Sequence, residues 1–140
     1  MVVTTSAISI LASGNPHLIY GTAWKEDETS GNISEAIRSG FRFIDTACQP
    51  KHYNEAGVGE GIFTVMKELN LSREDIYIQT KFTSYNVQDP DRLPYDPDAD
   101  LEDQVRQSVE KLLMNSKTTY LNYLLMHSPM RSEKEFSKTV

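Results

Sequence analysis

The sequence has one cysteine and no long apolar run, and both absences limit what the chain can be. Cys48 cannot form an internal disulfide, so packing rather than covalent bridging must hold the fold. No stretch approaches the roughly 18 to 20 apolar residues that a membrane-spanning helix requires. Residues 1–11 lack the positive charge and the apolar segment of a signal peptide. We therefore expect a cytoplasmic protein that does not contact membranes.

Clustered positive charge is missing as well. The 140 residues include 14 Lys and Arg against 20 Asp and Glu, which gives a net charge of −6 and no basic run. Nucleic-acid binding depends on clustered Lys and Arg that neutralise phosphates, so we predict no nucleic-acid partner. The 39% of hydrophobic and 24% of charged residues are typical of a soluble globular chain, which we treat as one domain over residues 1–140.

Spacings that bind metal ions are also absent. Asp45, His52 and His127 are potential ligands, but they are not arranged in a tight motif such as HExxH. We predict no metal site.

What the sequence does contain is an alternation of short apolar runs and helical periodicity. Residues 7–11 and 17–20 are two β-prone runs around a turn with Gly14 and Pro16, and they predict a strand or small β-hairpin at the N-terminus. Further strands are predicted at residues 41–44, 76–80 and 121–126, and helices at 29–39, 55–69 and from Asp100 onward, with the first turn of another at 132–136. Residues 84–100 contain three prolines and must form a loop.

This alternation predicts an α/β fold of about four βα units with a parallel sheet. A doubly wound sheet fits the same order of elements, but it normally has a glycine-rich turn after its first strand, and residues 21–24 do not match that motif. A partial (β/α)8 TIM barrel is therefore favoured.

Three successive predicted strands end in an ionisable residue: Asp45, Lys81 and His127. Because a (β/α)8 barrel carries its chemistry at the carboxyl ends of its strands, these residues are candidates for a common site with nearby Tyr53. A phenol is a poor acid near pH 7 unless a neighbouring cation such as Lys81 lowers its pKa. Asp45 would hold the ammonium, and His127 would donate to a substrate oxygen or relay a proton.

Several motifs in this order resemble those of aldo-keto reductases. The similarity covers residues 40–47, then Asn54-Glu55 and Val58-Gly59, the lysine strand at 80–82, the histidine strand at 123–129 and the early segment 21–24. The resemblance implies an NADP-dependent oxidoreductase that reduces aldehydes or ketones, small-molecule carbonyl substrates, with NADPH as hydride donor. It also implies that this chain is the N-terminal half of the barrel.

Carried over position by position, the resemblance assigns catalytic roles to Asp45, Tyr53, Lys81 and His127, with Tyr53 as general acid. It assigns cofactor contacts to Gly21, Thr22, Ala23 and Asp45, and substrate contacts to Trp24 and His127.

One position of the catalytic set is open on the sequence alone. The loop before Asn54 is longer than the family pattern and resembles inserted loops in fungal members. His52 occupies the ungapped register of the usual tyrosine, whereas Tyr53 directly precedes Asn54. We favour Tyr53.

A complete barrel has about 250 residues and eight strands, so we expect a truncated form with an incomplete cofactor site. Two alternatives stand beside it. The first is a non-catalytic half barrel that acts through its open sheet edges. The second is a different barrel chemistry in which Lys81 forms a Schiff base.

Overall fold

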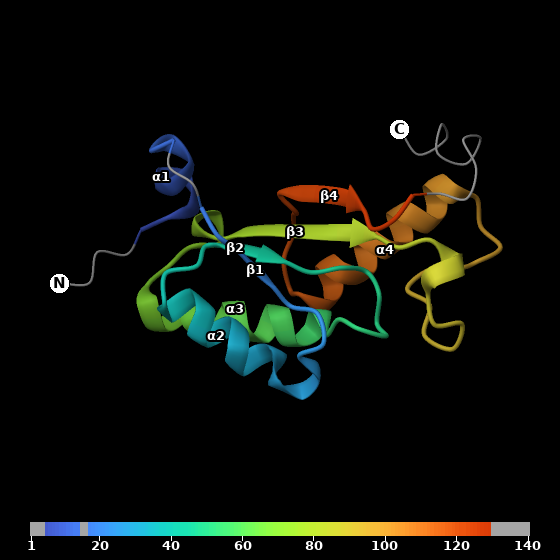
Figure 1. Ribbon diagram of the computed structural model, residues 1–140, viewed down its shortest axis with the longest axis horizontal. Helices are drawn as coiled ribbons and strands as arrows, with labels where there is room; N and C mark the ends of the chain where they lie inside the picture. Colours follow the sequence, from blue (N-terminus) through green and yellow to red (C-terminus); the bar gives the residue numbers. More distant parts are fainter. Residues whose placement is uncertain (1–4, 15–16, 130–140) are drawn as a thin grey trace.

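The computed structural model describes residues 5–14 and 17–129, which form one parallel sheet with helices packed against it (Figure 1). The four strands lie side by side in the order β1-β2-β3-β4, so their order in space is their order in the chain. All three pairings are parallel, as predicted. The strands are β1 (Ile19–Gly21), β2 (Phe43–Asp45), β3 (Tyr77–Phe82) and β4 (Tyr123–Met126).

Three long helices connect the strands: α2 (Thr29–Arg38), α3 (Glu55–Leu69) and α4 (Leu101–Asn115). Figure 1 shows α2 and α3 along one face of the sheet. Short 3-10 turns lie at Glu26–Glu28, Arg73–Asp75 and Tyr85–Val87, the last within the predicted proline-rich loop.

Local sequence signals set the ends of α3 and α4. The side chain of Asn54 accepts a hydrogen bond from the backbone N–H of Gly57 at 2.9 Å and thereby caps the first turn of α3. Asn70 ends this helix in the left-handed conformation, with φ of 53°. Asp100 caps α4 through the N–H of Asp103 at 3.0 Å, as predicted. Because Tyr53 directly precedes the cap of α3, the start of this helix also positions that phenol.

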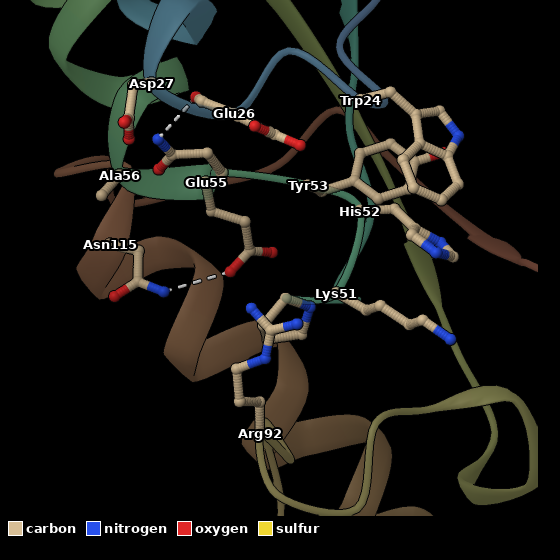
Figure 2. A pocket seen from close by; sticks show the side chains of 12 residues that line it. Trp24, Glu26, Asp27, Lys51, His52, Tyr53, Glu55, Ala56, Arg92 and Asn115 are labelled. Carbon is tan, nitrogen blue, oxygen red and sulfur yellow. Dashed lines mark hydrogen bonds between the residues drawn. The ribbon is translucent and has the colours of Figure 1, made fainter.

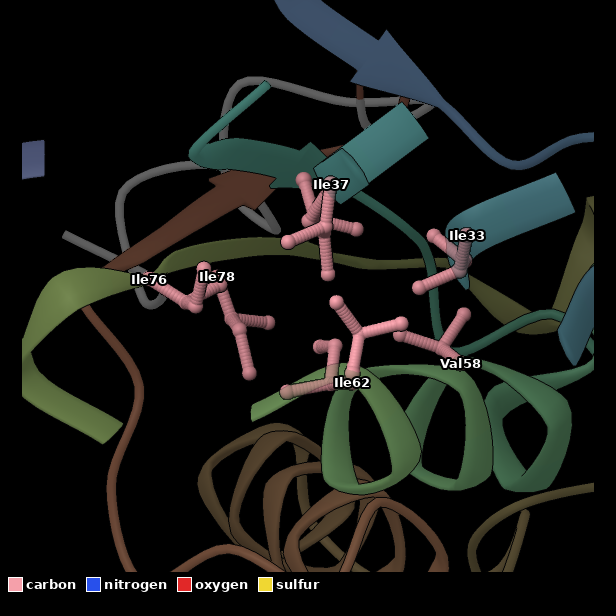
Figure 3. Close-up of a cluster of buried hydrophobic side chains, with 8 residues drawn as sticks. Ile33, Ile37, Val58, Ile62, Ile76 and Ile78 are labelled. Atoms are coloured by element: carbon pink, nitrogen blue, oxygen red, sulfur yellow. The ribbon is translucent and has the colours of Figure 1, made fainter. Parts of the chain in front are cut away.

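The hydrophobic core fills the space between the sheet and the pair α2 and α3. Ile33 and Ile37 of α2 meet Val58 and Ile62 of α3, and β3 contributes Ile78 (Figure 3). These side chains are at most 5% exposed. The apolar stripe predicted for residues 55–69 therefore faces this core.

Two glycines of α3 allow its neighbours to approach closely. A Cβ atom on Gly59 would lie 2.5 Å from the backbone of Ser116, just after α4. A Cβ atom on Gly61 would lie 2.6 Å from the carbonyl oxygen of Ser30 in α2. The lack of a side chain at both positions thus fixes how α3 fits between α2 and α4.

Among the described residues, the predicted N-terminal β-hairpin is wrong. Residues Ala7–Ala12 form a helix, α1, which lies apart from the other helices near the amino ends of the strands (Figure 1). Ser6 and Ser9 form a reciprocal capping box at its start, and this pair outweighs the β propensity of the isoleucines between and after them. The first strand begins at Ile19. The helix predicted at 132–136 lies outside the described residues.

Strands β1 and β4 form the two edges of the sheet within the described residues. Both edges carry exposed apolar side chains: Leu18 and Ile19 at β1, and Leu124 and Leu125 at β4. An exposed parallel edge of this kind presents unpaired backbone groups to a further strand.

Candidate active site

An ion pair between adjacent strands forms the centre of the site. Lys81, on β3, donates from Nζ to Oδ2 of Asp45, the last residue of β2, at 2.6 Å. The same ammonium donates to the backbone oxygen of Thr46 at 2.9 Å. The Lys81 and Asp45 side chains are only 16% and 19% exposed, so solvent screens this pair less than a surface ion pair. The structure therefore brings two of the predicted residues into direct contact.

The second oxygen of Asp45 is held by a residue that the sequence analysis missed. Gln79 donates from Nε2 to Oδ1 at 2.7 Å. It lies two residues before Lys81 on β3, so both side chains leave the same face of the strand. This alternation is a signal that was available in the sequence.

Tyr53 lies over the ion pair and next to His127. The Nζ atom of Lys81 is 5.3 Å from the centroid of the Tyr53 ring, within the range of a cation–π contact. The rings of Tyr53 and His127 have centroids 5.8 Å apart and meet edge to face at 74°. The carboxyl ends of β2, β3 and β4 and the loop before α3 thus converge on one place.

The ionisation of Tyr53 differs from the expectation. Partial burial, assisted by the negative charge of Asp45, raises the pKa of Tyr53 above its usual value of 10. The predicted lowering by Lys81 is not found, because burial disfavours the phenolate and the Lys81 charge is paired with Asp45 at 2.6 Å. Tyr53 consequently keeps its proton at neutral pH.

His127 is held from two sides. Its backbone N–H donates to the oxygen of Phe82 at 2.9 Å, and its Nδ1 lies 2.7 Å from Oγ1 of the buried Thr83. Burial and the nearby Lys81 lower the pKa of His127 from 6.5, although Asp45 opposes the shift. The imidazole is therefore neutral at pH 7.

His52, the alternative to Tyr53, is engaged elsewhere. Its Nδ1 lies 2.9 Å from Oε1 of Gln49, and its ring packs on Trp24 with centroids 3.8 Å apart. The backbone oxygen of His52 also accepts from the N–H of Trp24 at 2.8 Å. Trp24 itself has φ of 60° and is 68% exposed. These contacts join the loop before α3 to the loop after β1.

The segment after β1 lies beside Asp45. Gly21 is paired in register with Asp45, and the backbone oxygen of Asp45 accepts from the N–H of Thr22 at 3.1 Å and from its hydroxyl at 2.9 Å. The Thr22 hydroxyl is thus occupied within the sheet, and Ala23 is half-buried.

A cavity of about 520 Å³ opens next to Tyr53 (Figure 2). Trp24, His52 and Tyr53 line one part of it, and Glu55, Arg92 and Asn115 line another. Figure 2 shows the Glu55 carboxyl group turned toward Asn115, whose Nδ2 donates to Oε2 at 3.1 Å.

Glu55 is an ionisable group that the sequence analysis left without a role. It is 6% exposed, and its Oε1 has no hydrogen-bond partner among the described residues. Burial raises the pKa of this carboxyl to about 7. No group of three metal-binding side chains occurs within residues 5–14 and 17–129.

Comparison with known proteins identifies the family. The model of the Aldo/keto reductase family matches residues 14–139, which is most of the chain. The chain belongs to this family. An NADPH-dependent aldose reductase of Saccharomyces cerevisiae is 32% identical over 109 residues, and an NADPH-dependent D-xylose reductase of Candida boidinii is 29% identical over 117 residues.

Solved aldo-keto reductases share the fold. One from Brucella melitensis has a TM-score of 0.65 and 31% identity, and it matches over 91% of this chain and 43% of its own. An aldo-keto reductase of Bombyx mori in complex with NADP has a TM-score of 0.64 and 25% identity, over 84% of this chain and 36% of its own. The predicted partial (β/α)8 barrel is confirmed.

The match to longer relatives is partial. The alignment covers 76% of this chain but 29% of the Saccharomyces reductase, and 82% of this chain but 32% of the Candida reductase. The chain thus spans about a third of the length of these curated aldo-keto reductases. Among the described residues, no helix has the length and apolar character to cross a bilayer.

Proposed function

We propose that this aldo-keto reductase chain carries the proton-donating part of an NADPH-dependent reductase of aldehydes or ketones. The observation that supports the proposal most is the convergence of Tyr53 with the Asp45–Lys81 pair and His127 at the carboxyl ends of neighbouring strands. The names of the Saccharomyces and Candida relatives agree with this reaction class.

In the proposed reaction, Tyr53 donates its phenolic proton to the carbonyl oxygen as that oxygen gains negative charge. The phenolate left behind is an anion in a partly buried place, and the ammonium of Lys81 stabilises it. Asp45 keeps that ammonium in position. His127, neutral at pH 7, donates a hydrogen bond to the same carbonyl oxygen and orients it.

These four side chains can move protons, but none can supply a hydride, so the reaction requires a bound donor. We assign that donor as NADPH, which supplies the hydride when bound. Gly21, Thr22, Ala23 and Asp45 would contact it. The position of Gly21 supports this assignment, because it is exposed and nothing lies within 4 Å of a Cβ built there, which leaves room for a flat ring beside Asp45.

We assign the carbonyl substrate to the side of Tyr53 that faces Trp24 and His127. The exposed Trp24 ring, fixed on His52, offers an apolar wall at the mouth of the 520 Å³ cavity. The relatives' names suggest aldoses, D-xylose and methylglyoxal as first compounds to test.

The test is NADPH oxidation by the chain with each of these aldehydes, followed by absorbance, together with NADPH binding followed by fluorescence. We expect aldehyde-dependent oxidation that falls by about a thousandfold in Tyr53→Phe, because the ring stays and only the proton-donating hydroxyl group is lost. His52→Phe is the matched control and should keep most of the activity. Loss of activity in the His52 variant alone would transfer the acid role to His52.

A second candidate function is supported by the exposed apolar edges of the sheet. Leu18 and Ile19 at one edge and Leu124 and Leu125 at the other suit pairing with further strands. In that case the chain would act through assembly rather than catalysis. Size-exclusion chromatography of the chain with and without Leu125→Lys tests for assembly. An assembly through β4 should be weakened by the added charge, whereas a monomeric chain should elute at the same volume in both cases.

A further inference from the structure

Two donors from one strand hold the two oxygens of a single carboxylate at the site. Lys81 Nζ binds Oδ2 of Asp45 at 2.6 Å, and Gln79 Nε2 binds Oδ1 at 2.7 Å. We infer that Gln79 is a positioning residue that keeps the Asp45 carboxylate turned toward Lys81, and that it thereby sets the charge beside Tyr53. The kinetic part of this inference rests on the proposed function.

The geometry follows from the register of the strands. Gln79 is the β3 partner of Asp45, and Lys81 follows two residues later on the same face. With Lys81 alone, the carboxylate would be free to rotate about its last bond and direct either oxygen to solvent. The amide of Gln79 occupies Oδ1 and prevents this rotation, because an N–H···O bond has a strong directional preference.

The chemical nature of Gln79 matters as well as its position. Its amide is uncharged at every pH, so it satisfies Oδ1 without replacing Lys81 as the cation nearest Tyr53. It also directs the positive end of an N–H dipole at the negative charge of Asp45. That charge opposes ionisation of Tyr53, so the dipole partly offsets the effect.

The titratable groups around Tyr53 come from every strand that ends there. Asp45 lies on β2, Lys81 on β3, His127 just after β4, and His52 precedes Tyr53 in its own loop. Asp45 disfavours the phenolate and Lys81 favours it. A substitution of Gln79 therefore changes the pKa of Tyr53 indirectly, because it alters the opposing effects of Asp45 and Lys81 on the phenolate.

Two variants with side chains of similar length distinguish the effect of the N–H donor of Gln79 from the effect of its side-chain volume. Gln79→Met removes the N–H donor and keeps the volume, whereas Gln79→Glu replaces the donor by a carboxylate that repels Asp45. Gln104→Met is the matched control, because Gln104 also donates from Nε2, to the backbone oxygens of Pro97 and Ala99, far along the chain from the site.

The first readout does not require activity. Tyrosine labelled with carbon-13 at Cζ reports ionisation of each phenol by NMR, and Tyr53→Phe assigns the Tyr53 signal. We expect the alkaline midpoint of Tyr53 to rise from wild type to Gln79→Met and further, by about half a pH unit or more, in Gln79→Glu. Midpoints in both Gln79 variants equal to that of Gln104→Met would overturn the inference.

The second readout is kinetic. Gln79→Met should lower kcat about tenfold with little change in KM, because the residue acts through Asp45 and does not touch substrate. The activity of Gln79→Glu relative to wild type should recover as the pH falls through the pKa of the introduced carboxyl, which the negative charge of Asp45 raises above the usual value for Glu, because the protonated carboxyl donates again. A constant ratio at all pH values would contradict a donor role. Absence of NADPH oxidation in the wild type would reject the proposed function, while the NMR titration would still decide the role of Gln79.

Discussion

Oγ1 of Thr83 lies 2.7 Å from Nδ1 of His127, so this ring nitrogen is engaged by a hydroxyl group. Thr83 is fully buried, one residue beyond β3, and among the described residues its hydroxyl makes no other hydrogen bond. A hydroxyl that donates to Nδ1 leaves the proton of a neutral imidazole on Nε2. In the proposed reaction, Nε2 is then the atom that donates to the carbonyl oxygen.

Thr83→Val tests this arrangement, because it removes the hydroxyl and keeps the shape. We expect the proton of His127 to distribute over both nitrogens and kcat to fall about tenfold. Nitrogen-15 NMR of the imidazole measures the tautomer directly. Thr83→Ser, which restores a hydroxyl, should behave like the wild type, and an unchanged tautomer in Thr83→Val would show that another group sets it.

The pH dependence of reduction follows from two opposite shifts. The pKa of Tyr53 is raised above 10, so the acid stays protonated through the neutral range, and the pKa of His127 is lowered below 6.5, so the imidazole stays neutral there. We expect kcat/KM for reduction to be constant between these values. It should fall above pH 10, where Tyr53 loses its proton, and below pH 6.5, where His127 gains one. An alkaline limb near pH 8 would be inconsistent with Tyr53 as the acid.

The buried carboxyl of Glu55 should make the fold more stable at low pH. Its pKa rises from 4.5 to about 7 on folding, so the folded state binds the proton more tightly than the unfolded state. The associated stability is complete below pH 4.5 and is lost as the pH rises through about 7. Glu55→Gln keeps an oxygen for Asn115 and should raise the free energy of unfolding at pH 8 by up to about 3 kcal/mol. Urea unfolding at pH 4 and pH 8 measures the free energy of unfolding of each protein. An equal change between the two pH values in the wild type and in Glu55→Gln would exclude this carboxyl as the cause.

Close packing of α3 predicts a strong effect of a single methyl group. Gly59→Ala places a Cβ atom 2.5 Å from the backbone of Ser116, so helix α3 or the end of α4 must move. We expect a loss of about 2 kcal/mol or more in the free energy of unfolding. Gly31→Ala is the control within α2, where nothing lies within 4 Å, and it should stabilise by about 0.5 to 1 kcal/mol. Thermal unfolding of both variants provides the comparison, and a neutral Gly59→Ala would mean that α3 is not tightly confined.

The elements that the sequence predicted best are those with strong local signals. Asn54 and Asp100 are side-chain caps. The apolar spacing that follows each of them predicted the bounds of α3 and the start of α4 closely. The strand end at Asp45 was likewise predictable, because Asp45 interrupts an apolar run, whereas β3 continues one residue past the predicted end at Lys81. Alternation along β3 places Gln79 on the same face as Lys81.

Other features depend on contacts that a linear pattern does not contain. The Ser6–Ser9 box turned a β-prone run into helix α1. The lowered pKa expected for Tyr53 was wrong, because burial of the phenol and the negative charge of Asp45 raise the pKa, and both depend on the folded structure. The engagement of His52 by Gln49 and Trp24 depends on the path of a loop.

The order of the strands has a consequence for synthesis on the ribosome. Each new strand of this sheet is added next to the one made just before it, so the growing edge always serves as template for the next segment to emerge. The phenol, carboxylate, ammonium and imidazole would therefore be assembled in step with elongation, which proceeds at roughly 5 to 20 residues per second. Slowing translation between β3 and β4 should leave an intermediate in which Asp45 and Lys81 are already paired at the carboxyl ends of the strands but His127 is still missing.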